Sequence, residues 1–237
     1  MIEVQTTDFV AGARAARGLA VVIDVFRAFS VAAYATSRGA AQIWPVGAIE
    51  TARALKAAHP EALLIGERHA RPLPGFDCGN SPTELERIAV QGRTLIHTTH
   101  SGTQGLTNAV QADEIITGAL VNAAAIVQYI QQRGFERVTL VRMGHEARER
   151  CMEDDACATL ILRRLRGEAP DVAAIRTALR AAPSAAKFFD PACDWAPARD
   201  FDLCTAVDVF DFVLRLDRSV EPWRLMKVPA VTATTRQ

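Results

Sequence analysis

Three apolar runs in the chain each end in side chains of the types that bind phosphate esters and metal ions. The polar residues that follow the runs are Asp24 and Arg27, then Glu67 and Arg68, then Thr98, Thr99, Ser101 and Thr103. Carboxylates are natural Mg²⁺ ligands, and an arginine can donate paired hydrogen bonds to phosphate or carboxylate oxygens. Hydroxyls beside the start of a helix can bind phosphate oxygens as well. The pattern therefore indicates an enzyme that acts on a small anion.

Asp24 has both a functional and a structural explanation. A carboxylate at the end of a hydrophobic strand is costly without a partner, which favours a metal-binding or catalytic role. Alternatively, Asp24 could cap the following helix and pair with Arg27. The aspartyl-phosphate mechanism of the haloacid dehalogenase family needs a second aspartate two residues later, where this chain has Phe26. That mechanism therefore lacks support.

The N-termini of two expected helices are candidate anion-binding sites, because helix N-termini attract negative groups. The first has Ser81 at the N-cap, Pro82 at the first helical position and Glu84 at the capping-box position. Asn80 and Ser81 are the candidate anion-binding residues there, although Asn80 could instead form a turn. The second start, at Gly102, lacks the lysine and the spacing of a P-loop.

His100 lies in the turn before that second helix. Histidine titrates near neutral pH, so His100 is a candidate acid or base as well as a candidate substrate-binding residue. Histidines in turns and on surfaces more often have no catalytic role, and the sequence does not decide between these alternatives.

Glu153, Asp154 and Asp155 precede an apolar helical face. Acids at a helix start are favoured by the helix dipole, by ~0.3–1 kcal/mol each, which is a sufficient structural reason for one of them. Three in a row exceed what capping needs, so at least one could complete an oxygen-ligand Mg²⁺ site with Asp24 or Glu67. Residues of the preceding loop that could contact a substrate, or equally lie on the surface, are His145, Arg148 and Arg150.

The elements that position these residues alternate between strand and helix in short units, which is typical of βαβ construction. The predicted strands are residues 19–25, 42–46, 62–66, 94–98, 114–119 and 137–143, with an edge strand at 210–216. The predicted helices are residues 29–37, 49–58, one from 82, 103–110, 122–133, 153–166, 171–181 and 200–208. We expect one compact α/β domain over residues 1–237, with three α/β/α layers and a mixed, largely parallel sheet. Ligands of open α/β sheets bind at the carboxyl ends of the strands, where the candidate residues lie.

The first two-thirds of the chain contain a weak internal repeat. The order strand, helix, strand, helix, strand occurs in residues 19–66 and again in residues 94–143. A duplication would give two similar βαβαβ halves, residues 1–92 and 93–237. Alternatively, the repeat is only the alternation of strands and helices that any α/β chain shows at about this period.

The composition limits the partners of the protein. Of the 237 residues, 27 are Lys or Arg and 27 are Asp or Glu, so no global field favours nucleic acid or a membrane surface. No apolar run reaches the ~18 residues that span a bilayer, and the first residues lack signal-peptide features. The five cysteines show no common metal-binding spacing, as expected for reduced thiols in a cytoplasmic protein. A homodimer is expected only from the frequency of twofold symmetry.

Two common enzyme classes lack their motifs in this chain. No Gly-x-Ser-x-Gly occurs, which argues against a serine hydrolase of the α/β-hydrolase type. No Gly-x-Gly-x-x-Gly follows a strand, which argues against a Rossmann dehydrogenase.

Taken together, the motifs resemble the 2-phosphosulfolactate phosphatase family, in the family's order and over nearly the whole chain. The matching segments are residues 22–28, 66–68, 75–82, 98–103, 152–154 and 208–212. The stretch Gly-Phe-Asp-Cys-Gly-Asn-Ser-Pro at 75–82 is the most specific of them. In one departure, the family's Thr-Asn-Gly-Thr turn reads His-Ser-Gly-Thr at 100–103. This exchange bears on the substrate more than on the hydrolytic chemistry.

The resemblance implies a Mg²⁺-dependent phosphatase that hydrolyses 2-phospho-3-sulfolactate to sulfolactate and phosphate, a step associated with coenzyme M biosynthesis. It implies that Asp24, Glu67 and Asp154 hold Mg²⁺, with Glu153 beside them. The residues that would bind charge or orient the ester are Arg27, Arg68, Asn80, Ser81, Thr99, His100, Ser101 and Thr103. Two alternatives stay open: a phosphatase of another small phosphorylated acid, and a non-catalytic anion-binding protein on the same scaffold.

Overall fold

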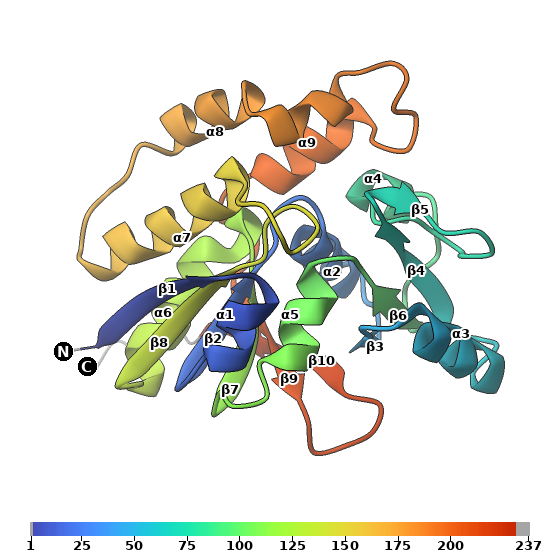
Figure 1. Ribbon diagram of the computed structural model, residues 1–237, viewed down its shortest axis with the longest axis horizontal. Coiled ribbons are helices and arrows are strands. Elements are labelled where there is room, and N and C mark those ends of the chain that lie inside the picture. The colour runs from blue at the N-terminus through green and yellow to red at the C-terminus, as the bar shows by residue number, and fades with distance from the viewer. Residues whose placement is uncertain (1, 231–237) are drawn as a thin grey trace, which may run out of the picture.

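The computed structural model describes residues 2–230 and has a mixed sheet of ten strands at its centre. The strand order is β1–β8–β2–β7–β9–β10–β3–β6–β4–β5 (Figure 1). The strands are β1 (Glu3–Asp8), β2 (Leu19–Ile23), β3 (Gln42–Pro45), β4 (Leu63–Arg68), β5 (Arg71–Pro72), β6 (Thr94–Thr98), β7 (Glu114–Gly118), β8 (Arg137–Arg142), β9 (Phe212–Asp217) and β10 (Arg224–Pro229). The expected α/β class with a mixed, mostly parallel sheet is confirmed.

Helices cover both faces of this sheet. They are α1 (Phe9–Ala15), α2 (Ala28–Ser37), α3 (Ile49–Ala58), α4 (Pro82–Leu85), α5 (Gly102–Asn108), α6 (Ala123–Arg133), α7 (Met152–Leu165), α8 (Val172–Arg180) and α9 (Ala198–Thr205), with 3₁₀ turns η1 (Leu120–Asn122) and η2 (Pro183–Phe188). On β2, Val22 packs in one core with α2 and α5, while Val21 packs on the other face with α6 and α7. Burial on both faces explains why the parallel strands read as continuous apolar runs.

Besides β1, which pairs in parallel with β8, the parallel strands form two sets of three, β8–β2–β7 and β3–β6–β4. The strand β2 lies between β8 and β7, whereas β6 lies between β4 and β3. When β2, β3 and β4 are matched with β6, β7 and β8 in chain order, this part of the sheet reads the same from either end. Two related βαβαβ units would give this symmetry, while the duplication itself, like the assignment of one domain, stays a prediction.

The expectation of an edge strand at residues 210–216 is wrong. The strand β9 forms an antiparallel hairpin with β10, and this hairpin lies inside the sheet between β7 and β3. Phe212, Val213 and Leu214 are all buried, and the apparent alternation comes from the half-buried Arg215, which pairs with Glu114 at 3.7 Å. The strands β1, β5 and β10 and the helix α1 were not predicted.

Several local predictions are confirmed closely. The strand at residues 94–98 and the helix at residues 49–58 have the expected bounds. Ser81 is the N-cap of α4 and its hydroxyl accepts a hydrogen bond from the Glu84 amide at 3.1 Å. Gly134 ends α6 in the left-handed conformation, with φ of 66°, which glycine adopts without steric cost.

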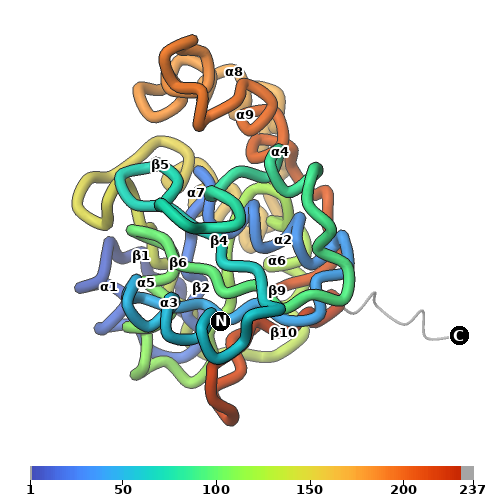
Figure 2. Tube along the Cα trace, turned by 90° about the vertical axis from the view of Figure 1, so that its right-hand side faces the viewer, coloured from blue at the N-terminus to red at the C-terminus, as the bar shows by residue number. Residues whose placement is uncertain are grey.

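The segment from α8 through η2 to α9 lies across one end of the molecule, opposite the β9–β10 turn (Figures 1 and 2). The helix α9 packs on α4, and η2 brings Ser184 and Lys187 to the pocket described below. Within residues 2–230, no helix has the length and apolar character to cross a membrane.

Candidate active site

A pocket opens at the carboxyl ends of β2, β4 and β6 and is closed on its other sides by the β8–α7 loop and η2. This is the position expected for a ligand site in an open α/β sheet. The predicted site residues that line the pocket are Asp24, Arg27, Glu67, Asn80, His100, Ser101, Glu153 and Asp154. Arg68, Ser81, Thr99 and Thr103 are not among the lining residues.

Asp24 lies at the bottom of the pocket, directly after β2. Its Oδ1 accepts a hydrogen bond from the Ala28 amide at 3.2 Å, whereas Oδ2 accepts none from the described residues. The start of α5 comes so close that a Cβ on Gly102 would lie 2.8 Å from Oδ2, so this approach requires glycine. Burial, with the negative charges of Glu67 and Glu153, raises the pKa of Asp24 to about 7.

Asp154 joins two loops through its carboxylate. Its Oδ1 accepts from the Val25 amide at 2.9 Å and its Oδ2 from the Gly144 amide at 2.8 Å. Burial and the negative charges of Asp24 and Glu153 raise the pKa of Asp154 well above its usual value. Asp154 therefore positions the pocket backbone and adds a second carboxyl group close to Asp24.

Like Asp154, Glu67 joins two loops of the pocket through its carboxylate. Its Oε1 accepts from the His100 amide at 2.7 Å and its Oε2 from the Ala70 amide at 2.8 Å. Each oxygen of Asp154 and Glu67 retains a second lone pair. Both residues can therefore still interact with a cation while they hold the loops together.

Glu153 is buried and faces η2, where Ser184 donates a hydrogen bond to its Oε2 at 2.6 Å. The Cys151 thiol also donates a hydrogen bond to this carboxylate, which helps to raise the pKa of the thiol. The third acid of the run, Asp155, lies outside the pocket and pairs with Arg142 at 2.9 Å and Arg150 at 2.8 Å. The run of three acids thus divides between the pocket and a surface ion-pair network.

Arg27 is buried beside the carboxylates and held by Asp200, which is fully buried. Its Nη1 donates to Asp200 Oδ2 at 2.8 Å and to the Trp195 carbonyl at 3.1 Å, and its Nη2 donates to the Ala70 carbonyl at 3.0 Å. Guanidinium has five N–H donors, so Nε and one position on Nη2 remain for a ligand. Asp200 also accepts from the Ser81 hydroxyl at 2.8 Å, which gives Ser81 a structural role.

Lys187 is a second cation in the pocket, and no local sequence pattern marks it. Burial and the nearby charge of Arg27 lower its pKa, while the charges of Glu153 and Asp24 act in the opposite direction. It comes from η2, a short turn without periodicity. Asp200, the partner of Arg27, was missed as well because it is 173 residues away in the chain.

The hydroxyl-rich turn after β6 mostly satisfies itself. The Thr99 amide donates to Thr103 Oγ1 at 2.9 Å, and the Thr103 amide donates to Thr99 Oγ1 at 3.0 Å. Ser101 reaches the pocket, where its Oγ accepts from the Ala147 amide at 2.9 Å. Arg68 donates to the Gly47 carbonyl at 2.8 Å and to Thr98 Oγ1 at 2.9 Å, and so holds neighbouring loops.

Asn80 presents an amide donor to the pocket. Its Oδ1 is 3.1 Å from Nε2 of the buried His97, which therefore acts as the donor. Its Nδ2 has no acceptor among the described residues, so it is available to an oxygen atom of a ligand. Asn80, Arg27 and Lys187 together supply the donors that an anion in the pocket needs.

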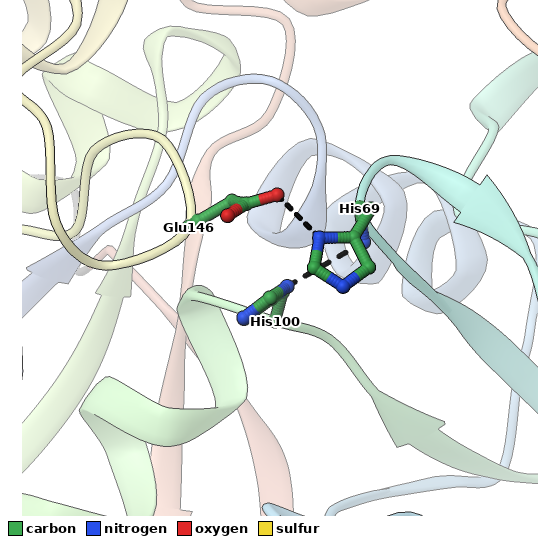
Figure 3. A group of neighbouring side chains, drawn as sticks. All are labelled: His69, His100 and Glu146. Carbon is green, nitrogen blue, oxygen red and sulfur yellow. Dashed lines mark hydrogen bonds and ion pairs between the residues drawn. The ribbon is translucent and has the colours of Figure 1, made fainter.

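At the mouth of the pocket, His69, His100 and Glu146 form what we call the rim cluster (Figure 3). Their potential ligand atoms all lie within 4.8 Å of one another, and within residues 2–230 no other set of three His, Cys, Asp or Glu side chains meets this criterion. Asp24, Glu67 and Asp154 therefore do not form such a set. Mg²⁺ is usually held by only one or two carboxylates with water and phosphate oxygens, so this wider spacing is compatible with Mg²⁺.

The electrostatics of the pocket fit a hard divalent cation. Asp24, Glu153 and Asp154 are buried carboxylates in mutual repulsion, and Asp24 Oδ2 accepts no hydrogen bond from the described residues. The atoms that these carboxylates offer to a metal ion are oxygens, which are the ligands that Mg²⁺ prefers. A cation among them would offset the repulsion that raises the pKa of Asp24 and Asp154.

Comparisons with known proteins show which family the chain is similar to. The model of the 2-phosphosulpholactate phosphatase family matches residues 5–219. A protein of Thermotoga petrophila named "Probable 2-phosphosulfolactate phosphatase" is 39% identical over 147 residues, 62% of each chain. One of the same name from Carboxydothermus hydrogenoformans is 39% identical over 142 residues, 60% of this chain and 58% of that one. Another from Gloeobacter violaceus is 34% identical over 162 residues, 68% of each chain.

The alignments with the first of these relatives thus span about three-fifths of the relatives' length. The family model covers much more, because it begins before β2 and ends after β9. The matched region contains every pocket residue named above. The chain belongs to the 2-phosphosulpholactate phosphatase family.

Proposed function

We propose that the protein is a Mg²⁺-dependent phosphatase that hydrolyses 2-phospho-3-sulfolactate to 3-sulfolactate and phosphate. The observation that carries the proposal is the cluster of buried carboxylates at the end of β2, faced by the two cations Arg27 and Lys187 in one pocket. Carboxylates suit a metal ion and the cations suit an ester with several negative charges. Membership of the family supplies the substrate class.

Asp24, Glu67 and Asp154 remain the residues that we propose to hold Mg²⁺, and we add the buried Glu153 of the same pocket to this proposal. Asp24 Oδ2 accepts no hydrogen bond from the described residues, so we expect this atom to be a direct ligand. Glu67 and Asp154 already accept backbone amides on both oxygens, so we expect them to act through bound water. When bound, Mg²⁺ would supply Lewis acidity and lower the pKa of a bound water.

The donors of the pocket would stabilise the charge of the phosphoryl group. Arg27 is oriented by Asp200 and Trp195, so its free N–H groups are positioned before the substrate arrives. Such preorganisation is the main means by which proteins catalyse phosphoryl transfer. Lys187, with its lowered pKa, is a candidate to hold a proton near the leaving oxygen.

The carboxylate and sulfonate of the substrate need their own donors, away from the metal. Asn80 Nδ2 faces the pocket from one side, and His100 reaches it from the turn after β6. Ser101 fixes the loop that faces them through the Ala147 amide. We propose that Asn80, His100 and Ser101 orient the ester, while Ser81, Thr99, Thr103 and Arg68 support the loops that carry them.

The decisive experiment is an assay of phosphate release from 2-phospho-3-sulfolactate, beside phospholactate and phosphoglycolate, with Mg²⁺ and with EDTA. We expect release that is specific for the sulfonated ester and is lost in EDTA. Release from the other esters would keep the hydrolytic chemistry and change the substrate. No release from any ester, together with binding of the esters by calorimetry, would replace the enzyme with an anion-binding protein. The homodimer remains a prediction, to be checked by light scattering.

A further inference from the structure

The rim cluster brings together three side chains from three separate loops. His69 comes from the turn between β4 and β5, His100 from the turn between β6 and α5, and Glu146 from the loop between β8 and α7. His69 Nδ1 and Glu146 Oε1 are 2.5 Å apart, and the two imidazole rings meet edge to face with centroids 4.7 Å apart (Figure 3). The potential ligand atoms of the three side chains thus converge on one point.

An ordinary surface ion pair does not account for this arrangement. One histidine and one glutamate would suffice for a pair, as His59 and Glu61 show elsewhere with atoms 3.7 Å apart. Here a second imidazole lies against the first, and two protonated rings at this distance would repel each other. Two neutral imidazoles and one carboxylate are, in contrast, a common ligand set for a metal ion.

The backbone presents the ligands in an unusual way. His69 and Glu146 have φ values of 52° and 50°, in the left-handed region that non-glycine residues rarely adopt. The residue after each of them, Ala70 and Ala147, has the same conformation. Both loops are fixed on the pocket side, since the Ala70 amide binds Glu67 and the Ala147 amide binds Ser101. The positions of His69 and Glu146 are therefore set by the loops.

We propose that His69, His100 and Glu146 form a binding site for a borderline divalent metal ion of the Zn²⁺ class, separate from the acidic floor of the pocket. Nitrogen donors favour Zn²⁺, Co²⁺ or Ni²⁺, whereas the oxygen donors around Asp24 favour Mg²⁺. The two sites thus differ in the metal that they select. The proposal does not depend on the phosphatase activity, because metal binding is measured without a substrate.

Three protein ligands leave at least one coordination position open, as in zinc sites that bind a further ligand. His100 and Glu146 both line the pocket, so an ion held by them would lie beside its interior. An oxygen atom of an anionic ligand in the pocket could occupy the open coordination position of the ion. The site would then hold an acidic end of a ligand, whose phosphate lies deeper, beside Asp24.

The test is titration of the full-length protein with Zn²⁺ by calorimetry, and with Co²⁺ by visible absorption, both in excess Mg²⁺ to fill the acidic site. We expect one equivalent of tightly bound Zn²⁺, and a Co²⁺ spectrum with d–d bands and no thiolate charge-transfer band. His69→Ala should weaken Zn²⁺ binding at least tenfold, and Glu146→Gln should do the same. His59→Ala is the matched control, because it removes another exposed histidine beside a glutamate.

Three results would overturn the proposal. The first is the absence of Zn²⁺ binding by the wild-type protein in Mg²⁺. The second is equal binding by the wild-type protein and both rim variants, with circular dichroism showing that all are folded. The third is a thiolate band in the Co²⁺ spectrum, which would assign the ion to a cysteine. His69 is 68% exposed, so its loss should leave the fold intact, and Glu146→Gln gives an independent check.

Discussion

The loops after β2 and after β6 occupy matching places in the sheet but make different contributions to the pocket. The strand β2 is the middle strand of the set β8–β2–β7, and β6 is the middle strand of the set β3–β6–β4. Each loop leads into a helix on the same face of the sheet, α2 after β2 and α5 after β6. The two helix starts meet where Gly102 lies against Asp24 and Ala28. The loop after β2 contributes buried charges, whereas most hydroxyls of the loop after β6 bind their own backbone.

The difference follows from the chemistry of the side chains. A threonine hydroxyl is short and finds an amide within its own turn, as Thr99 and Thr103 do. A carboxylate has more acceptor capacity than one turn can satisfy, and its charge is costly to bury. Asp24 therefore keeps an oxygen that faces the pocket. Polar residues at a strand end indicate a site more strongly when they are charged.

Removal of the charge after β2 should have the largest effect. We expect Asp24→Asn to lower kcat with Mg²⁺ by about 10³-fold or more, because it removes both a ligand and the charge that attracts the ion. Phosphate release at saturating Mg²⁺ measures the effect. Asp8→Asn is the matched control, since Asp8 also ends a parallel strand but pairs with Arg142 at 2.8 Å outside the pocket. Equal losses in both variants would remove Asp24 from the site.

The same variant should be more stable than the wild type when no metal is present. The pKa of Asp24 in the folded protein, about 7, lies above its ordinary value of 3.8, so the folded protein holds this proton to higher pH than the unfolded chain does. This contribution to stability is present at low pH and is lost as the pH rises through that window. At pH 8 in EDTA we expect Asp24→Asn to unfold at a higher urea concentration. Mg²⁺ should reduce the difference by stabilising only the wild type.

A second comparison separates neighbouring acids at the start of α7. Glu153→Gln should reduce kcat/KM by about 10- to 100-fold and weaken activation by Mg²⁺, because Glu153 faces the pocket. Asp155→Asn should leave turnover nearly unchanged, because Asp155 pairs with Arg142 and Arg150. A titration of activity with Mg²⁺ gives both results. A larger effect of Asp155→Asn would reverse the assignment.

In the loop after β6, loss of a hydroxyl should affect stability rather than chemistry. Thr103→Val leaves the buried Thr99 amide without its acceptor, so we expect a loss of about 2 kcal/mol in the free energy of unfolding. KM and kcat should change less than about threefold, since Thr103 does not line the pocket. Thr107→Val, which removes a half-buried hydroxyl that donates to the Thr103 and Gln104 carbonyls within α5, is the control and should cost less. A large loss of kcat in folded Thr103→Val would return the hydroxyl to the substrate site.

Local patterns predicted the strands and helices that carry the site, and the carboxylates and Arg27 at its centre. Those signals are local, since an apolar run, a cap or a charge at a strand end is visible within a few residues. Asp200 and Lys187 lie in a C-terminal segment that reaches the pocket only through packing of η2 and α9, so no local pattern marks them. The interior place of β9 is also a tertiary property, set by its pairing with β10 and β7.

The last comparison concerns His97, which lies on β6 and contacts Asn80. Burial, with the charge of Arg68, lowers the pKa of His97 from 6.5 to about 4, so the unfolded chain binds a proton more readily than the folded protein. Its contribution to stability is complete above the unfolded pKa and is lost as the pH falls from 6.5 towards 4, by about 1 kcal/mol per pH unit. Asp24, whose pKa rises from 3.8 to about 7 on folding, acts in the opposite direction over the whole of this range, so the measurement belongs in the Asp24→Asn background.

In the Asp24→Asn background, His97→Gln should weaken the pH dependence of the free energy of unfolding, measured with urea, between pH 6.5 and 4. Glutamine can donate a hydrogen bond to Asn80 without titrating. The two central strands would then differ in the sign of their response to pH. An acid after β2 favours the folded state at low pH, and a buried base within β6 favours it at high pH. An unchanged slope in His97→Gln would mean that His97 accepts its proton within the fold, and the contrast between the two strands would then be limited to their loops.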